Sequence, residues 1–295
     1  RENRGGKLYT LVYGNPCAVH VDPIEKKPFY HVLPGTPSFS LSTAGCNLRC
    51  LYCQNWMISQ SPPEEVSSQE LMPEQVVEAA TQGACPTIAF TYAEPTVFYE
   101  YMLDTARLAR ARGIRSVVVS AGYINPGPLR ALCAAVEAIK IDFKGFSESF
   151  YERVCGATLE PVLEGLKIIR EEGVHLEIVN LVVPTLNDAD EQLRGLCRWI
   201  VDHLGPDVPT HFTRFYPMYK LQNLSPTPVK TLEKARAIAK EAGIHYAYIG
   251  NVPGHEGNNT FCPHCGKRVI AREGFAVLSN QIVQGKCAFC GYPIP

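Results

Sequence analysis

Three cysteines with the spacing of metal ligands stand in the first fifth of the chain. Cys46, Cys50 and Cys53 form a C-x3-C-x2-C run that follows a strand-like segment. Iron–sulfur cubes usually take four cysteines, and structural zinc sites also take four protein ligands. These three thiolates are one ligand short, so the spacing suggests a [4Fe–4S] cluster with one iron open to another molecule. Chance crowding and part of a zinc site are the alternatives, and the preceding Gly45 argues against chance.

A second group of cysteines lies near the other end of the chain. Cys262 and Cys265, and then Cys287 and Cys290, form two C-x2-C pairs, each followed by glycine. Four thiolates in this pattern are typical of zinc ribbons and rubredoxins. Zn²⁺ is the expected occupant, and iron stays open because four thiolates suit both metals. Because four protein ligands complete it, we interpret this site as closed and structural. An electron relay, which would require iron, and a second cluster are the alternatives. The remaining five cysteines, Cys155 among them, are interpreted as ordinary buried thiols.

Strand-like and helical segments alternate between the two cysteine groups. Strands separated by helices form βα units, so the pattern predicts a parallel sheet. Several strands, such as 116–119 and 178–183, are nearly continuous apolar runs, as expected when both faces of a sheet are buried. The pattern alone does not separate an open doubly wound sheet from a barrel. The predicted strands are 38–43, 87–92, 115–120, 138–142, 175–183, 210–216 and 246–249, and the predicted helices are 73–81, 95–112, 126–137, 147–154, 161–172, 188–204 and 231–242.

Polar residues end several of the predicted strands, where ligands gather in βα folds. Glu94 follows the second strand and could bind a ligand or complement the positive end of the next helix. Ser120 ends the third strand, where an ordinary turn and a ligand contact are both open. Asp142 and Lys144 stand at alternate positions at the end of the fourth strand, so their side chains share one face. Buried charges are costly unless paired, so this face holds a structural ion pair or a ligand site.

These motifs resemble those of radical S-adenosylmethionine (SAM) enzymes, especially the activases of glycyl-radical enzymes. The resemblance covers nearly the whole chain and points to the AmmeMemoRadiSam-system branch, which is similar to pyruvate formate-lyase-activating enzymes. It implies an α/β fold, a partial (β/α)6 barrel of the TIM type, followed by a small zinc-ribbon or rubredoxin-like module. The matching segments are Gly45–Asn55, Tyr92–Pro95, Ile141–Gly145, Val183–Asp188 and Asn251–Glu256.

The resemblance also implies roles for individual residues. SAM would chelate the open iron of the cluster through its amino and carboxylate groups. Two departures from the activase pattern are present: Tyr92 and Ala93 replace two glycines, and Tyr219 stands where activases carry a histidine. The implied contacts are Tyr52 to the adenine, Glu94 to the amino group, Ser120 to the ribose, Lys144 with Asp142 to SAM or the substrate backbone, and Asn180 near the SAM carboxylate.

An enzyme activity follows from the resemblance. A reduced cluster would cleave SAM, and the resulting 5′-deoxyadenosyl radical would abstract hydrogen from a protein or peptide substrate, with glycyl-radical activation as the narrower form. The implied partners are a low-potential electron donor of the flavodoxin or ferredoxin type and, by family association, AMMECR-domain and MEMO-like proteins. Radical modification of a small molecule or RNA, and a non-catalytic iron–sulfur electron carrier, are the alternatives.

Composition limits the class of protein and its partners. The net charge of −1 argues against a broad nucleic-acid-binding surface. No apolar run reaches the roughly 18 residues of a membrane span, and the cysteine pattern fits a reducing cytoplasm. The chain begins at Arg1 without a methionine, and we expect that it was cut from a longer protein. We expect an N-terminal hairpin or extension over 1–37 that packs on the core, a barrel over 38–257 and a four-cysteine metal ribbon over 258–295.

Overall fold

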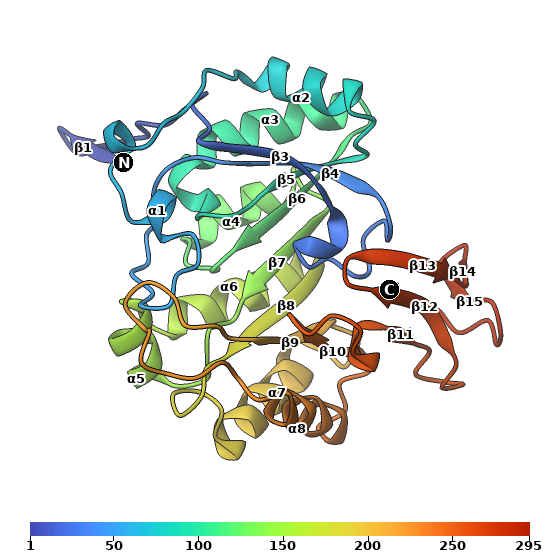
Figure 1. The fold of residues 1–295 in the computed structure, drawn as a ribbon. Coiled ribbons are helices and arrows are strands. Elements are labelled where there is room, and N and C mark those ends of the chain that lie inside the picture. The colour runs from blue at the N-terminus through green and yellow to red at the C-terminus, as the bar shows by residue number, and fades with distance from the viewer.

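An eight-stranded sheet forms the centre of the computed structural model, which describes residues 1–295. The strand order is β10-β9-β8-β7-β6-β5-β4-β3, and β4 to β10 run parallel. The order follows the chain, and the sheet stays open because β3 and β10 form its two edges (Figure 1). The strands are β3 (Ala18–Pro23), β4 (Pro37–Ser42), β5 (Thr87–Phe90), β6 (Arg115–Ser120), β7 (Ala138–Asp142), β8 (His175–Val182), β9 (Thr210–Arg214) and β10 (Ala247–Gly250).

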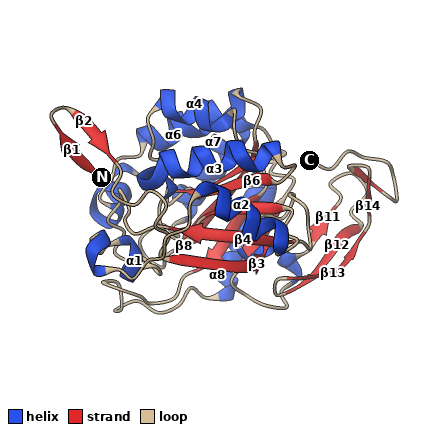
Figure 2. Ribbon diagram, turned by 90° about the horizontal axis from the view of Figure 1, so that it is seen from above, coloured by secondary structure: helices blue, strands red, loops and turns tan.

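Helices connect the parallel strands and cover the outside of the sheet (Figure 2). Each buries one face at helical spacing; in α7 that face includes Leu193, Leu196 and Ile200. Six strand–helix units followed by β10 confirm the predicted α/β partial barrel. The connecting helices are α2 (Pro73–Gln82), α3 (Tyr99–Ala111), α4 (Pro126–Cys133), α6 (Glu160–Glu171), α7 (Asp190–Leu204) and α8 (Val229–Glu241), and the short helices α1 (Trp56–Ser59) and α5 (Glu148–Phe150) lie in loops.

Three predicted helices differ clearly in their bounds from the structure. The helix predicted over 95–112 is a 3-10 turn, Pro95–Phe98, followed by α3. The helix predicted over 126–137 ends at Cys133, and Glu137 N already donates to Ser116 O of β6 at 2.8 Å. The helix predicted over 147–154 is the short α5 followed by a π-helical turn, Tyr151–Cys155. Gly156 ends that turn at φ 65°, a conformation that favours glycine.

The first 37 residues join the barrel more closely than predicted. The hairpin of the structure is β1 (Glu2–Arg4) with β2 (Lys7–Tyr9), while Ala18–Pro23 forms β3 and pairs antiparallel with β4. The chain then enters the barrel, where Ile24 and Phe29 pack against Val117 of β6. This segment fills the barrel interior at the amino ends of the parallel strands. The division of the chain at residues 37 and 257 remains a proposal.

The C-terminal residues form a small separate layer of strands. These residues lie at the end of the barrel opposite to α1 (Figures 1 and 2). The strands of this layer are β11 (Thr260–Phe261), β12 (Arg268–Glu273), β13 (Ala276–Asn280), β14 (Ile282–Val283) and β15 (Lys286–Cys287). None of the helices has the length and apolar character that crossing a membrane requires.

Candidate functional site

The loop after β4 places the three cysteines of the predicted cluster on one cavity. Gly45, at φ 109°, turns the chain out of the strand, and its N–H donates to Ile58 O at 2.8 Å, which ties the start of the loop to its end. Cys46, Cys50 and Cys53 all line a cavity of ≈ 450 Å³. No fourth cysteine lines it. This donor set fits a [4Fe–4S] cluster that takes three protein thiolates and keeps one iron open.

A further thiol supports the loop from behind. Cys155 is fully buried at the end of the π-helical turn, and its carbonyl accepts a hydrogen bond from Arg49 N at 2.7 Å. The Cys155 thiol and the charge of Lys144 lower the pKa of Cys50, although burial opposes this shift. A lowered pKa favours the thiolate, which is the form that binds iron. Cys155, interpreted from the sequence as an ordinary buried thiol, is buried behind the loop that carries the predicted cluster ligands.

Glu94 is fixed at the cavity wall by four hydrogen bonds. Its carboxylate accepts from Thr96 N (3.1 Å), Thr96 Oγ1 (2.8 Å), Ser120 Oγ (2.7 Å) and Ala121 N (2.8 Å). It also caps the 3-10 turn Pro95–Phe98, so the capping and ligand-binding interpretations are compatible. Both Glu94 and Ser120 line the cavity. The carboxylate is thus held in one orientation at the place where a ligand's ammonium group could meet it.

Tyr92 has the backbone conformation expected of the glycine that it replaces. Its φ of 68° lies in the left-handed region, which costs a residue with a side chain about 1–2 kcal/mol. Two contacts hold it there: its carbonyl accepts from Asn55 Nδ2 at 2.6 Å, and its hydroxyl donates to Asp22. The departure from glycine at this position therefore changes the side chain and leaves the course of the backbone unchanged.

The carboxylate of Asp142 is shared by two lysines inside the cavity. Lys144 Nζ lies 3.0 Å from Asp142 Oδ2, and Lys140 Nζ lies 2.8 Å from Asp142 Oδ1. Burial by itself would raise the pKa of the Asp142 carboxyl, but the two ammonium charges outweigh it and hold that pKa well below its usual range. The same carboxylate keeps Lys144 charged: its attraction outweighs burial and raises the Lys144 pKa. The predicted structural ion pair is therefore present, and all three side chains line the cavity, where a ligand could contact them.

Tyr52 and Asn180, two further predicted contact residues, lie differently. Tyr52 lines the cavity, yet its buried hydroxyl lies 3.7 Å from Cys155 Sγ. The structure does not bring Asn180 to the cavity, which corrects the predicted contact. Its Nδ2 donates to Phe143 O at 2.8 Å, and the side chains that line the cavity from β8 are Val179 and Leu181. Alternation along a strand turns Asn180 to the opposite face.

Tyr219 does not line the cavity either, although activases carry a histidine at the corresponding position. Its ring stacks on Trp56 with centroids 5.3 Å apart and an interplanar angle of 14°. The neighbouring Lys220 N donates to Leu51 O at 2.9 Å, so this segment covers the cysteine loop from outside. Trp56 directly follows Asn55, which lines the cavity, and the next residue, Met57, is 65% exposed. We name Trp56, Met57 and Tyr219 the apolar rim.

Several cavity residues were missed from the sequence. Lys140 could have been found, because it stands two residues before Asp142 on the same strand and must share its face. Lys26 and Lys27 carried no signal, since the segment 1–37 was predicted as a hairpin packed on the core and not as part of the cavity wall. Further lining residues that were missed include Thr91, Thr213 and Asn251.

The four C-terminal cysteines come together as predicted. The sulfur atoms of Cys262, Cys265, Cys287 and Cys290 all lie within 4.8 Å of one another. Four thiols at this separation fit a zinc-ribbon-like site that could hold zinc or iron. Because the site lies in the ribbon, it is separate from the cysteine loop at the opposite end of the barrel (Figure 1).

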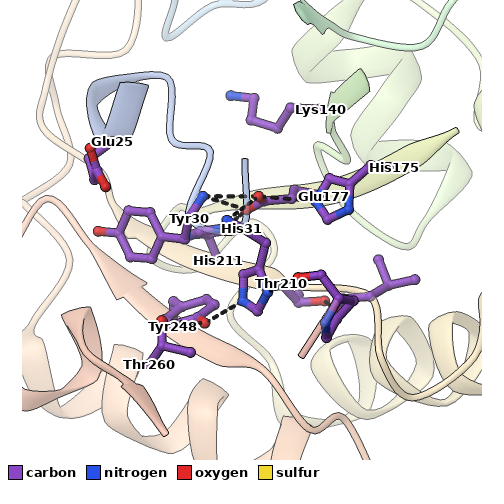
Figure 3. Close-up of polar contacts among 12 residues, drawn as sticks. Glu25, Tyr30, His31, Lys140, His175, Glu177, Thr210, His211, Tyr248 and Thr260 are labelled. Atoms are coloured by element: carbon purple, nitrogen blue, oxygen red, sulfur yellow. Dashed lines mark hydrogen bonds and ion pairs between the residues drawn. The ribbon is translucent and has the colours of Figure 1, made fainter. Parts of the chain in front are cut away.

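A buried polar cluster joins the ribbon to the floor of the barrel, by which we mean the end where the parallel strands begin. Figure 3 shows the arrangement of this cluster. At its centre the carboxylate of Glu177, on β8, accepts from the backbone N–H groups of Tyr30 and His31 at 2.9–3.0 Å. Its other contacts are to His211 Nε2 at 2.7 Å and His175 Nε2 at 3.3 Å. From the ribbon, Arg272 Nη2 donates to Tyr30 O at 2.8 Å. The floor of the barrel is therefore closed by hydrogen-bonded groups from three parts of the chain.

Comparison with known proteins agrees with this geometry. The model of the radical SAM superfamily matches residues 40–197. An uncharacterized protein of Methanocaldococcus jannaschii is 48% identical over 100% of this chain and 88% of its own length. The pyruvate formate-lyase-activating enzyme of Clostridium pasteurianum is 26% identical over 53% of this chain and 66% of its own length.

Among solved structures, the fold is similar to a radical SAM methyltransferase from Sphaerobacter thermophilus. The TM-score is 0.59 at 14% identity, covering 76% of this chain and 70% of that one. Radical SAM proteins use a [4Fe–4S] cluster and SAM, the two cofactors that the cavity residues predict. The chain belongs to the radical SAM superfamily.

Proposed function

We propose that this protein cleaves SAM reductively at a [4Fe–4S] cluster on Cys46, Cys50 and Cys53 and uses the radical on a protein or peptide substrate. One observation carries the proposal. The three thiols line the same cavity as the fixed carboxylate of Glu94 and the charged side chain of Lys144. When bound, the cluster and SAM supply a 5′-deoxyadenosyl radical, which abstracts hydrogen.

The residues of this chain would bind SAM and exclude water. Glu94, oriented by Ser120, would accept hydrogen bonds from the SAM amino group. Lys144, held by Asp142, would bind a carboxylate of SAM or a carbonyl of the substrate backbone. Tyr52 would contact the adenine from the loop. Closure of the barrel floor by the Glu177 cluster would keep water from a reactive radical.

A protein or peptide substrate is supported by two facts. The relative from Clostridium pasteurianum is named for activating pyruvate formate-lyase, which is a protein. Trp56 and Met57 of the apolar rim are exposed beside the cavity mouth, and exposed apolar side chains at a mouth are typical of surfaces that bind protein. Glycyl-radical activation is the narrower form of this proposal. AMMECR-domain and MEMO-like proteins, suggested by the AmmeMemoRadiSam resemblance, are the first partners to test, with a flavodoxin or ferredoxin as electron donor.

Anaerobic reconstitution with iron, sulfide, SAM and a strong reductant tests the proposed cleavage. The wild-type protein should form 5′-deoxyadenosine, and Cys50→Ala should not. Cys17→Ala is the matched control, because Cys17 lies outside the cavity and should keep the activity. If the wild type forms no more 5′-deoxyadenosine than Cys50→Ala, the proposed cleavage is wrong.

Isotope transfer tests the substrate class. Deuterated candidate proteins are incubated with the reconstituted enzyme, and deuterium is measured in the 5′-deoxyadenosine by mass spectrometry. Transfer from a protein partner supports the proposal. Transfer from small-molecule metabolites with none from proteins would favour the small-molecule alternative.

A further inference from the structure

Lysine side chains dominate the charged lining of the cavity. Four of them line it, Lys26, Lys27, Lys140 and Lys144, against two carboxylates, Glu94 and Asp142. Lys144 and Glu94 are already assigned to SAM by the proposed function. The other three come from two places: Lys26 and Lys27 from the turn after β3, and Lys140 from β7.

These lysines are only partly neutralised within the protein. Lys27 Nζ lies 2.7 Å and Lys26 Nζ 2.9 Å from Asp22, so two ammonium groups share one carboxylate, which also accepts the Tyr92 hydroxyl. The Lys27 side chain is 1% exposed. A buried ammonium that shares its counter-ion is costly, and an anionic ligand would lower that cost.

Lys140, on β7, also shares its carboxylate with a second lysine. Its side chain is 5% exposed, and its ammonium, which can donate three hydrogen bonds, has one polar contact, the ion pair with Asp142. The carboxylate of Glu177 stands beside it in the strand register, but its oxygens are already bonded to other groups (Figure 3). Lys140 therefore has donors available on the side of the cavity.

SAM would not remove the excess. It carries a sulfonium and an ammonium against one carboxylate, so it brings a further positive charge into the cavity. Its amino group is expected at Glu94 and its carboxylate at the cluster or Lys144. Lys27 and Lys140 then keep Asp22 and Asp142 as their ion-pair partners, and each of these carboxylates already serves a second lysine.

We propose that Lys27 and Lys140, with Lys26 at the rim, form a subsite for an oxyanion of the substrate, a carboxylate or a phosphate. The inference rests on the proposed function, because this group would belong to the molecule from which hydrogen is abstracted. Binding is non-covalent, through charge-assisted hydrogen bonds. The neighbouring lining side chains Val119, Val179 and Leu181 would contact an apolar part of the same molecule. The subsite selects substrates that carry an anionic group beside the reacting carbon–hydrogen bond.

Anion titration of the reconstituted holoprotein tests the subsite. Acetate and inorganic phosphate are the probes, titrated by calorimetry at constant ionic strength in potassium chloride with SAM present. The wild type should bind one of them saturably, one per chain. Stronger binding of phosphate assigns a phosphate-bearing substrate, and stronger binding of acetate assigns a carboxylate-bearing one.

Lysine variants show where the anion binds. Lys27→Met and Lys140→Met should each weaken binding at least about 10-fold, since each removes a charged donor. Lys140→Arg, which keeps the charge, should retain most of it and covers the case in which Lys140→Met does not fold. Lys230→Met is the matched control, because Lys230 is exposed and outside the cavity, and it should bind the anion like the wild type.

Two results would overturn the subsite: no saturable anion binding by the wild type, or equal affinity in Lys27→Met and the wild type. Formation of 5′-deoxyadenosine is measured in the same wild-type sample. Cleavage of SAM without anion binding rejects the subsite and leaves the proposed function standing. Anion binding without cleavage rejects the proposed function instead.

Discussion

Ser120 Oγ donates a 2.7 Å hydrogen bond to the carboxylate of Glu94, although Ser120 ends β6 and Glu94 follows β5. The neighbouring Ala121 N bonds the other carboxylate oxygen at 2.8 Å. Two adjacent strands thus fix both oxygens of one side chain. The serine predicted to contact the ribose of SAM therefore has a second role, which is to orient Glu94.

Replacement of Ser120 by alanine should weaken SAM binding. Glu94 keeps three of its four hydrogen bonds, so we expect a rise in Kd of about 10-fold, the scale of one lost charge-assisted hydrogen bond. The measurement is equilibrium SAM binding to the reconstituted protein. Ser279→Ala, at an exposed position of the ribbon, should bind SAM normally. An unchanged Kd in Ser120→Ala would show that Glu94 needs no support from Ser120.

Asp142→Asn should destabilise the fold, because Lys140 and Lys144 both lose their carboxylate. The expected loss in the free energy of unfolding is about 2–3 kcal/mol, below that of a fully buried pair since the Asp142 side chain is 31% exposed. The folded-state pKa of Asp142 is lowered, so its contribution is complete above the unfolded pKa of about 3.9 and is lost only below it.

The difference between wild type and Asp142→Asn in urea unfolding should therefore be constant from pH 6 to 8. Asp190→Asn is the control, because Asp190 pairs with Lys234 at the surface, and it should change stability by less than about 1 kcal/mol. Equal losses in the two variants would contradict a special role for the Asp142 pairs.

Cys265→Ser should release the metal of the ribbon and loosen the barrel floor. Holo wild type should contain one metal ion per chain beyond the four irons of the cluster, and the variant should lack it. So small a ribbon depends on its metal to stay folded. Its Arg272 donates a hydrogen bond to Tyr30 O in the barrel floor, so the two parts are connected. Amide hydrogen exchange should therefore accelerate both in β12 and at Tyr30 and His31.

Metal analysis and exchange measured by mass spectrometry check this prediction. Cys17→Ser, outside both cysteine groups, should leave metal content and exchange unchanged. Accelerated exchange confined to the ribbon would show that the floor is stable without it.

A residue of this site could be predicted when the position of its side chain follows from the sequence close to it. The cysteine loop and the pairs at 262–265 and 287–290 could be predicted, because ligand spacing is local. Asp142 and Lys144 could be placed on one face because alternation in a strand is strict. The same rule could have excluded Asn180, had the face of β8 been known. Lys27 could not be placed, since the antiparallel pairing of β3 at the sheet edge is a long-range choice that alternation does not fix.

Acidification should destabilise the protein through the histidines of the floor. Burial lowers the pKa of His31 to about 4 and also lowers that of His211, so burial favours the neutral form of both rings in the folded chain. An unfolded histidine has a pKa of about 6.5. Between about pH 4 and 6.5 the unfolded chain therefore binds more protons, and stability rises with pH across this window. From pH 7.5 to 5 we expect His31 alone to remove about 1–2 kcal/mol.

Urea unfolding at a series of pH values checks the histidine prediction, with metal content measured at each pH because acid also releases metal from thiolates. His31→Gln should unfold with a shallower dependence on pH than the wild type, since it lacks one of the groups that gain a proton on unfolding. His203→Gln is the control: His203 is exposed on α7, and its removal should leave the slope unchanged. If His31→Gln has the wild-type slope, the acid sensitivity arises elsewhere, and the floor does not depend on a neutral His31.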